Sequence, residues 1–222
     1  MKKILFLLVL CCFLTACAAE QGAPSFPSTT AAPETTAAGL RISPLPETID
    51  LGHLDNCTVA VSLKEGDAYV DDTGAMQMKV TVYTYELFDL VHISQLKAGD
   101  TLTIRQQDVP VTSVERDESG LMQINGGLEQ GGYNLVTYDD GVFFEILPSD
   151  AKYWQELGEA TMRVSPDFIY TDSSDLDKGE VVYYPGDFLV EGTGIDYNFS
   201  PNNTTIVIEN ERIVAMNRVY IP

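Results

Sequence analysis

The chain has 222 residues, with 13 Lys and Arg against 33 Asp and Glu, which gives a formal net charge of −20 at pH 7. A surface of this charge repels phosphate groups, so the composition argues against nucleic acid and anionic lipid headgroups as partners. Cations and basic surfaces are favoured in their place.

The first residues carry the pattern of an export signal. Lys2 and Lys3 precede an unbroken apolar run over residues 4–14. This run is too short to span a hydrocarbon core of about 30 Å as a helix, but it suits the hydrophobic region of a signal peptide. The run ends in Leu14-Thr15-Ala16-Cys17, which resembles the lipobox of bacterial lipoproteins. The resemblance implies a signal peptide over residues 1–16, cleavage before the cysteine, and lipid on Cys17.

The segment after the lipobox differs in composition. Residues 17–40 begin with the lipidated cysteine and are rich in Pro, Thr and Ala, with almost no large apolar side chains. Such a segment cannot bury enough surface to offset the entropy lost on ordering. We therefore predict a flexible tether over residues 17–40 and one globular domain over residues 41–222.

Strand patterns dominate the predicted domain. Apolar and polar residues alternate from Cys57 to Leu63, which predicts a half-buried strand with Cys57 as a small core residue. Asp71 to Gly74 and Asp139 to Gly141 are typical turns, and the second predicts a β-hairpin. Predicted strands cover 57–63, 76–82, 101–104, 109–114, 121–124, 135–138, 142–147, 168–170, 181–184, 188–190, 205–208 and 212–221.

Helix patterns are few. Ala151, Trp154 and Leu157 have helical spacing and predict one short helix over residues 148–158. Residues 86–96 are a second candidate for one or two helical turns. Many short strands separated by turns every 8–12 residues are typical of barrels and sandwiches. The sequence therefore predicts an all-β fold, an antiparallel barrel or sandwich of about ten strands with one or two short helices.

Motifs of catalysis are scarce in this sequence. It has no Gly-x-Ser-x-Gly elbow, no His-Glu-x-x-His and no Walker A pattern. Cys57 is the cysteine that remains after cleavage and lipidation, and the two histidines are His53 and His92. This inventory favours a non-catalytic protein. With 33 acidic residues, an acid pair of the kind that hydrolases use stays open.

One acidic segment offers oxygen ligands around a glycine turn. Asp172, Asp175, Asp177 and Glu180 lie close to Gly179 in the sequence. Ca²⁺ binds six to eight oxygens, so calcium is the one cofactor that the sequence suggests. The spacing departs from the EF-hand loop, and a solvated polar loop without any cofactor explains the same residues.

Aromatic residues give a second candidate site. Tyr83 and Tyr85 follow the polar face of the strand whose other face carries Met78 and Val80. Exposed tyrosines can stack on sugar rings or anchor a protein partner. Cross-strand aromatic pairing, or a second small core beneath a loop, explains the same pattern.

Taken together, these features predict a membrane-anchored bacterial lipoprotein on the extracytoplasmic face of the cell membrane. Its domain is expected to be a non-catalytic binding module for a protein, a glycan or a cell-wall component. Two alternatives stay open, a cell-envelope hydrolase with an acid pair and a structural subunit of an envelope assembly.

Overall fold

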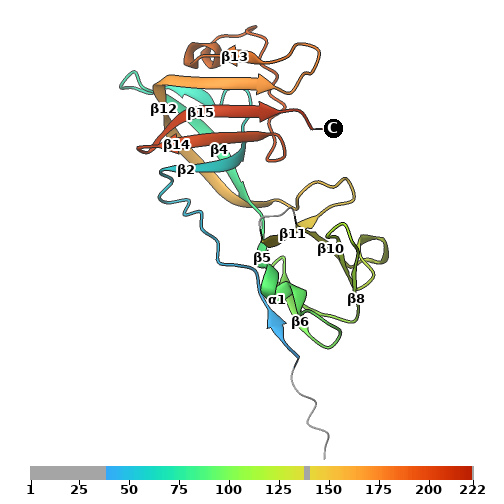
Figure 1. The fold of residues 1–222 in the computed structure, drawn as a ribbon. Helices are drawn as coiled ribbons and strands as arrows, with labels where there is room; N and C mark the ends of the chain where they lie inside the picture. Colours follow the sequence, from blue (N-terminus) through green and yellow to red (C-terminus); the bar gives the residue numbers. More distant parts are fainter. Residues whose placement is uncertain (1–38, 138–140, 222) are drawn as a thin grey trace, which may run out of the picture. The chain divides into compact units, whose positions relative to one another are not determined.

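The computed structural model describes residues 39–137 and 141–221, and strands account for much of them (Figure 1). Contacts divide the chain into Met1–Ala37 and Ala38–Pro222, and all the described residues belong to the second unit. The described residues form fifteen strands, one short α-helix and two 3₁₀ turns, so the all-β prediction is confirmed. Cys17 and the predicted signal peptide lie outside the described residues.

Five strands form a closed barrel. They are β2 (Cys57–Ser62), β4 (Met76–Thr84), β12 (Gln155–Ser173), β14 (Thr204–Glu209) and β15 (Arg212–Val219). The ring runs β2–β4–β12–β15–β14 and back to β2, and only the β12–β15 pairing among these is parallel. The long β12 closes the ring because its first half pairs with β4 and its second half with β15. The OB fold is one five-stranded Greek-key barrel of this general kind.

Alternation of apolar and polar residues along most of the strands places an apolar row inside the barrel. Two further strands extend the sheet at its ends, β3 (Ala68–Val70) beside β4 and β13 (Val181–Tyr183) beside β12. The buried residues of the barrel core include Val59, Val61, Met78, Val80, Val82, Met162, Val164, Phe168, Tyr170, Ile206, Ile208, Ile213 and Met216.

Residues 85–154, here called the insert, separate β4 from β12 in the sequence and have their own core. One sheet holds five strands, and a second, of three strands, includes a residue pair from before the barrel. Side chains of both sheets share one buried cluster that includes Phe88, Leu102 and Ile124. The strands are β5 (Leu87–Asp89), β8 (Val114–Arg116), β9 (Met122–Ile124), β10 (Tyr133–Val136) and β11 (Val142–Ile146), then β1 (Arg41–Ile42), β6 (Thr101–Ile104) and β7 (Gln107–Pro110).

Short helical segments and turns complete the insert. Helix α1 (Leu90–Ser94) lies within the predicted range 86–96, and the Asp89 carboxylate caps it by accepting from the His92 N–H. A 3₁₀ turn, η1 (Leu128–Gln130), precedes β10. The predicted hairpin is confirmed by the antiparallel β10–β11 pairing, with Gly141 at φ 76°.

Three local predictions are wrong. Residues 109–114 do not form one strand, because β7 ends at Pro110 and β8 begins at Val114 in the other sheet. Residues 148–158 form no helix, because Lys152 bridges to Ile146 and the chain enters β12 at Gln155, where pairing with β4 outweighs the local helical spacing. Residues 188–190 form no strand, because Phe188 belongs to a second 3₁₀ turn, η2 (Pro185–Leu189). The Asp187 carboxylate caps η2 by accepting from the Tyr184 N–H at 2.7 Å.

Candidate functional site

An open groove of about 670 Å³ lies beside the barrel. One wall is the turn at Glu65 and Gly66 together with the edge strand β3. The other wall is the segment 188–197, which runs from the end of η2 toward β14. Ligand pockets commonly have volumes of about 300–1,000 Å³, so the groove is large enough for a ligand of several side chains.

The groove displays apolar side chains to solvent from both walls. Tyr69 and Val70 of β3 are 45% and 53% exposed, and Leu189 and Val190 of the opposite wall are 42% and 62% exposed. Single exposed apolar residues are ordinary, but four gathered on facing walls form a patch of the kind that marks interaction sites.

Contacts between aromatic rings attach the segment 188–197 to the barrel. Phe188 is buried and packs against Tyr170 of the barrel core and against Tyr197, which lines the groove. Tyr197 in turn packs edge-on against Phe199, with ring centroids 5.7 Å apart. Such contacts fix ring positions, so the segment 188–197 is packed onto the barrel rather than free of it.

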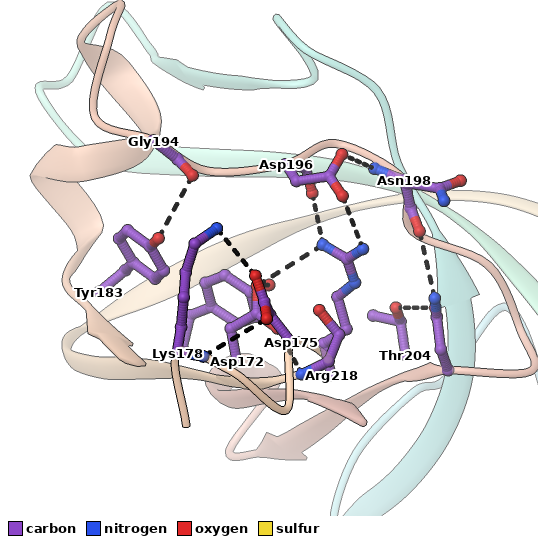
Figure 2. Close-up of polar contacts among 12 residues, drawn as sticks. Asp172, Asp175, Lys178, Tyr183, Gly194, Asp196, Asn198, Thr204 and Arg218 are labelled. Atoms are coloured by element: carbon purple, nitrogen blue, oxygen red, sulfur yellow. Dashed lines mark hydrogen bonds and ion pairs between the residues drawn. The ribbon is translucent and has the colours of Figure 1, made fainter. Parts of the chain in front are cut away.

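A buried arginine holds the same segment by polar contacts (Figure 2). Arg218 of β15 lies in the inward row after Met216 and is 4% exposed. Its Nη2 donates to the Asp196 carboxylate at 2.9 Å, and its Nη1 donates to the Asp196 carbonyl oxygen at 2.7 Å. Nη1 also lies 3.5 Å from the Asp172 carboxylate of β12. The guanidinium thus joins two barrel strands to the groove wall.

The pKa values in this network keep its charges in place. Burial raises the pKa of the Asp172 carboxyl, but hydrogen bonds from Ser174 and Tyr170 and the Arg218 charge outweigh burial, so the pKa lies below its ordinary value. Burial, then the bond to Asp172, raise the pKa of the Tyr170 hydroxyl, which therefore stays protonated and donates at 2.8 Å. Asp172 is ionised at neutral pH and faces a permanent cation.

Two further hydrogen bonds fix the outer wall. The Tyr183 hydroxyl of β13 donates to the Gly194 carbonyl oxygen at 3.3 Å, and Figure 2 shows this bond beside the Arg218 network. The Thr193 hydroxyl donates to the Asp187 carbonyl oxygen at 3.0 Å. The wall is therefore positioned before any ligand arrives.

The predicted calcium residues have other partners in the structure. Asp172 belongs to the Arg218 network, and Asp175 forms an ion pair with Lys178 at 3.0 Å. Asp177 and Glu180 are exposed. Within residues 39–137 and 141–221, no group of three or more His, Cys, Asp or Glu is placed to hold a metal ion. The four acids thus do not converge on one point.

The two predicted tyrosines lie in different surroundings. Tyr83 is half-buried on β4, and its hydroxyl lies 3.1 Å from the Ser62 hydroxyl. Tyr85 follows the end of β4 and packs edge-on against Phe144 and Trp154, with Lys152 Nζ 3.9 Å from its ring centre. Neither tyrosine lines the groove described above. Tyr85 has the setting of a small second core.

Two further reactive groups, Cys57 and Glu145, lie outside the groove. Burial, then the Asp55 charge, raise the pKa of the Cys57 thiol, which keeps it protonated and weakly nucleophilic. Burial raises the pKa of the Glu145 carboxyl, and the bonds and charge of Arg105 offset this only in part. Glu145 is 4% exposed within the insert and does not line the groove.

Sequence patterns left the groove and its anchor unrecognised. Arg218 carries the clearest signal, since it stands two residues after Met216 and so shares its inward row. A charge in an apolar row requires a carboxylate partner. The sequence does not say which of its 33 acidic residues supplies it, and the structure shows Asp172 and Asp196.

Comparisons with protein-family models, with curated proteins and with solved structures gave no match to this chain. No helix in the described part of the chain combines the length and the apolar content needed to cross a bilayer.

Proposed function

We propose that this protein is a lipid-anchored binding module on the extracytoplasmic face of a bacterial cell membrane, and that the groove is its binding site. The anchor rests on the lipobox resemblance at Cys17. The tether predicted over residues 17–40 would carry the domain away from the bilayer, where a partner in the envelope or outside the cell can reach it.

The observation that carries the proposal is the exposed apolar surface on two walls that are already in place. A stable domain has reason to bury Val190, Leu189, Tyr69 and Val70, yet all four line one groove and stay more than 40% exposed. The wall that bears Val190 is held by Arg218, so the groove needs little reorganisation on binding. Preorganisation of this kind strengthens binding because less ordering is required.

A second candidate function is a cell-envelope hydrolase, since Glu65 and Glu191 both line the groove. Acid-pair hydrolysis of a glycan also requires polar side chains that hold and orient the sugar. Apart from these two acids, the side-chain polar groups of the lining are the hydroxyls of Thr193, Tyr69 and Tyr197. The lining therefore favours binding over hydrolysis.

The anchor is tested in the producing bacterium. Radioactive palmitate should label the full-length protein, and Cys17→Ser should abolish the label and release the protein from the membrane fraction. A membrane-bound, unlabelled parent protein would contradict the lipid anchor.

The groove is tested by photo-crosslinking on intact cells. A photoreactive amino acid is placed at Val190, which is 62% exposed, or at Val91 in the insert, which is 61% exposed and serves as a matched control. We expect a discrete adduct from position 190 and none from position 91. Equal adducts from both positions, or none from either, would contradict a binding role for the groove. An adduct with a second copy of the chain would favour the structural-subunit alternative.

A further inference from the structure

Two acidic side chains in the groove lack basic partners. Glu65 and Glu191 are exposed, and neither forms an ion pair with a lysine, arginine or histidine of the described residues. Lys64 precedes Glu65 but does not line the groove, and no described lysine, arginine or histidine does. Asp175 and Glu159 have lysine partners, whereas other exposed acids outside the groove, such as Glu118, have none among the described residues. The groove thus combines an apolar surface with unneutralised negative charge.

One of these acids shares the groove with an aromatic ring. Glu65 and Tyr197 both line the groove, and the pKa of the Tyr197 hydroxyl is raised, first by burial and then by the Glu65 charge. A carboxylate beside a tyrosine offers an ion pair and a cation–π contact to the same ammonium or guanidinium group. An anion would meet repulsion from both acids, and a neutral sugar would find few side-chain donors there.

The free edge of β3 adds a backbone pattern. The Lys79 N–H donates to the Asp67 carbonyl oxygen, and the Asp71 N–H donates to the Ala75 carbonyl oxygen. Every second residue from 67 to 71 therefore directs its backbone N–H and C=O groups toward β4. Because this pattern alternates in an antiparallel pair, Ala68 and Val70 turn their N–H and C=O groups to the other side. Strand β3 ends the sheet there, with no strand beyond it among the described residues. An edge with no neighbouring strand can pair with an extended peptide.

We propose that the groove binds an extended segment of a partner protein in which basic and apolar residues alternate. A lysine or arginine would meet Glu65 and the Tyr197 ring, apolar neighbours would cover Val70 and Val190, and the backbone would pair with Ala68 and Val70. The net charge of −20 would speed the approach of such a segment. This inference rests on the groove being the binding site, as proposed above.

The test measures fluorescence anisotropy of labelled, end-capped pentapeptides with the full-length protein in detergent. The probes alternate leucine with lysine, leucine with glutamate, or serine with lysine. We expect the leucine–lysine peptide to bind at least tenfold more tightly than either of the others. N-methylation of its alternate amides should weaken binding further, because it removes the edge hydrogen bonds. Equal affinity of the leucine–glutamate or serine–lysine peptide, or no affinity for any probe, would overturn the proposal.

Substitution of Glu65 and Glu191 tests whether these two acids bind the peptide. The double variant E65Q/E191Q should lose at least tenfold in affinity for the leucine–lysine peptide and lose most of its salt dependence. The control Glu209→Gln changes another exposed acid, which lies at the end of β14 and outside the groove, and this variant should bind as the parent does. Unchanged affinity of E65Q/E191Q would overturn the proposed contacts. A groove adduct from position 190 on cells, together with failure of all peptides, would reject this ligand class and leave the binding role intact.

Discussion

The barrel and the insert each contain an arginine–carboxylate pair with one buried partner. In the barrel the arginine is buried, and in the insert the carboxylate is buried. In the barrel, the Arg218 side chain is 5% exposed and its partner Asp196 is 67% exposed. In the insert the order is reversed, since the Glu145 side chain is 3% exposed and the Arg105 side chain is 34% exposed. Arg105 donates from Nε to Glu145 at 3.0 Å and stacks 3.8 Å from the Tyr153 ring centre.

The difference matters because only one of the two buried groups, the carboxylate, can lose its charge. A carboxylate deprived of its partner can take up a proton, whereas a guanidinium stays charged at any ordinary pH. The pair in the insert can therefore adjust to pH. The pair in the barrel is fixed, and the groove wall that carries Asp196 depends on a cation that cannot be neutralised.

The largest expected effect is that of Arg218→Met. It removes the cation that Asp172 and Asp196 share at the end of the barrel, and breaking a buried pair of this kind costs about 3 kcal/mol. Thermal and urea unfolding of the full-length protein, followed through its single tryptophan, would measure the loss.

The matched control for that variant is Arg212→Met, which removes an exposed arginine from the same strand. It should leave the unfolding free energy close to that of the parent. Equal effects of the two variants would mean that the network of Arg218 does not hold the barrel end.

Arg105→Met should have the next largest effect, and its size should depend on pH. Because the pKa of Glu145 is already raised by burial, the folded chain holds this proton to a higher pH than the unfolded chain. The stability due to this group is complete below about pH 4 and is lost as the pH rises through the folded-state pKa.

Loss of Arg105 raises that folded-state pKa further. The free energy of unfolding of Arg105→Met should therefore be only slightly below that of the parent near pH 4, and about 2 kcal/mol below it at pH 8. This magnitude allows for the partial exposure of Arg105. Unfolding free energies at several pH values would measure it, and adding Glu145→Gln should remove the pH dependence. A deficit that does not change with pH would show that Glu145 is not the responsible group.

The smallest expected effect is that of Asp196→Asn, which tests the wall rather than the fold. Because Asp196 is mostly exposed, the overall unfolding free energy should fall by less than about 1 kcal/mol. Hydrogen exchange of the amides in 190–197 should nevertheless become several-fold faster. Asp108→Asn breaks the exposed pair with Arg41 at 2.8 Å and serves as the control. Unchanged exchange in 190–197 would contradict the anchoring role of Arg218.

Alternation within single strands predicted most of the fold. Val59 and Val61, or Val80 and Val82, show their buried row without any knowledge of neighbours. The barrel itself was less visible, since closure depends on β12 changing partner along its length, from β4 to β15. Local spacing misled where pairing decided the outcome, as at Trp154 and Leu157.

The site was harder to predict than the strands. A bulge at Val214 shifts the inward row of β15 from Ile213 to Met216, so simple alternation from Ile213 points Arg218 outward. The groove joins residues near 65–70 to residues near 188–197, and no pattern within either segment specifies the other. Tyr83 and Tyr85 looked alike in the sequence, but the end of β4 at Thr84 separates their surroundings.

The position of the insert has a consequence for the order of folding. Thr84 and Gln155 are direct partners in the β4–β12 ladder, so the insert leaves and re-enters the barrel at one point. Pairing of those two strands across an unfolded chain would require closure of a long loop, which slows folding. An insert that folds first brings the two ends together and removes most of that loop. We therefore expect the insert to act as a folding template, with the barrel closing only after it.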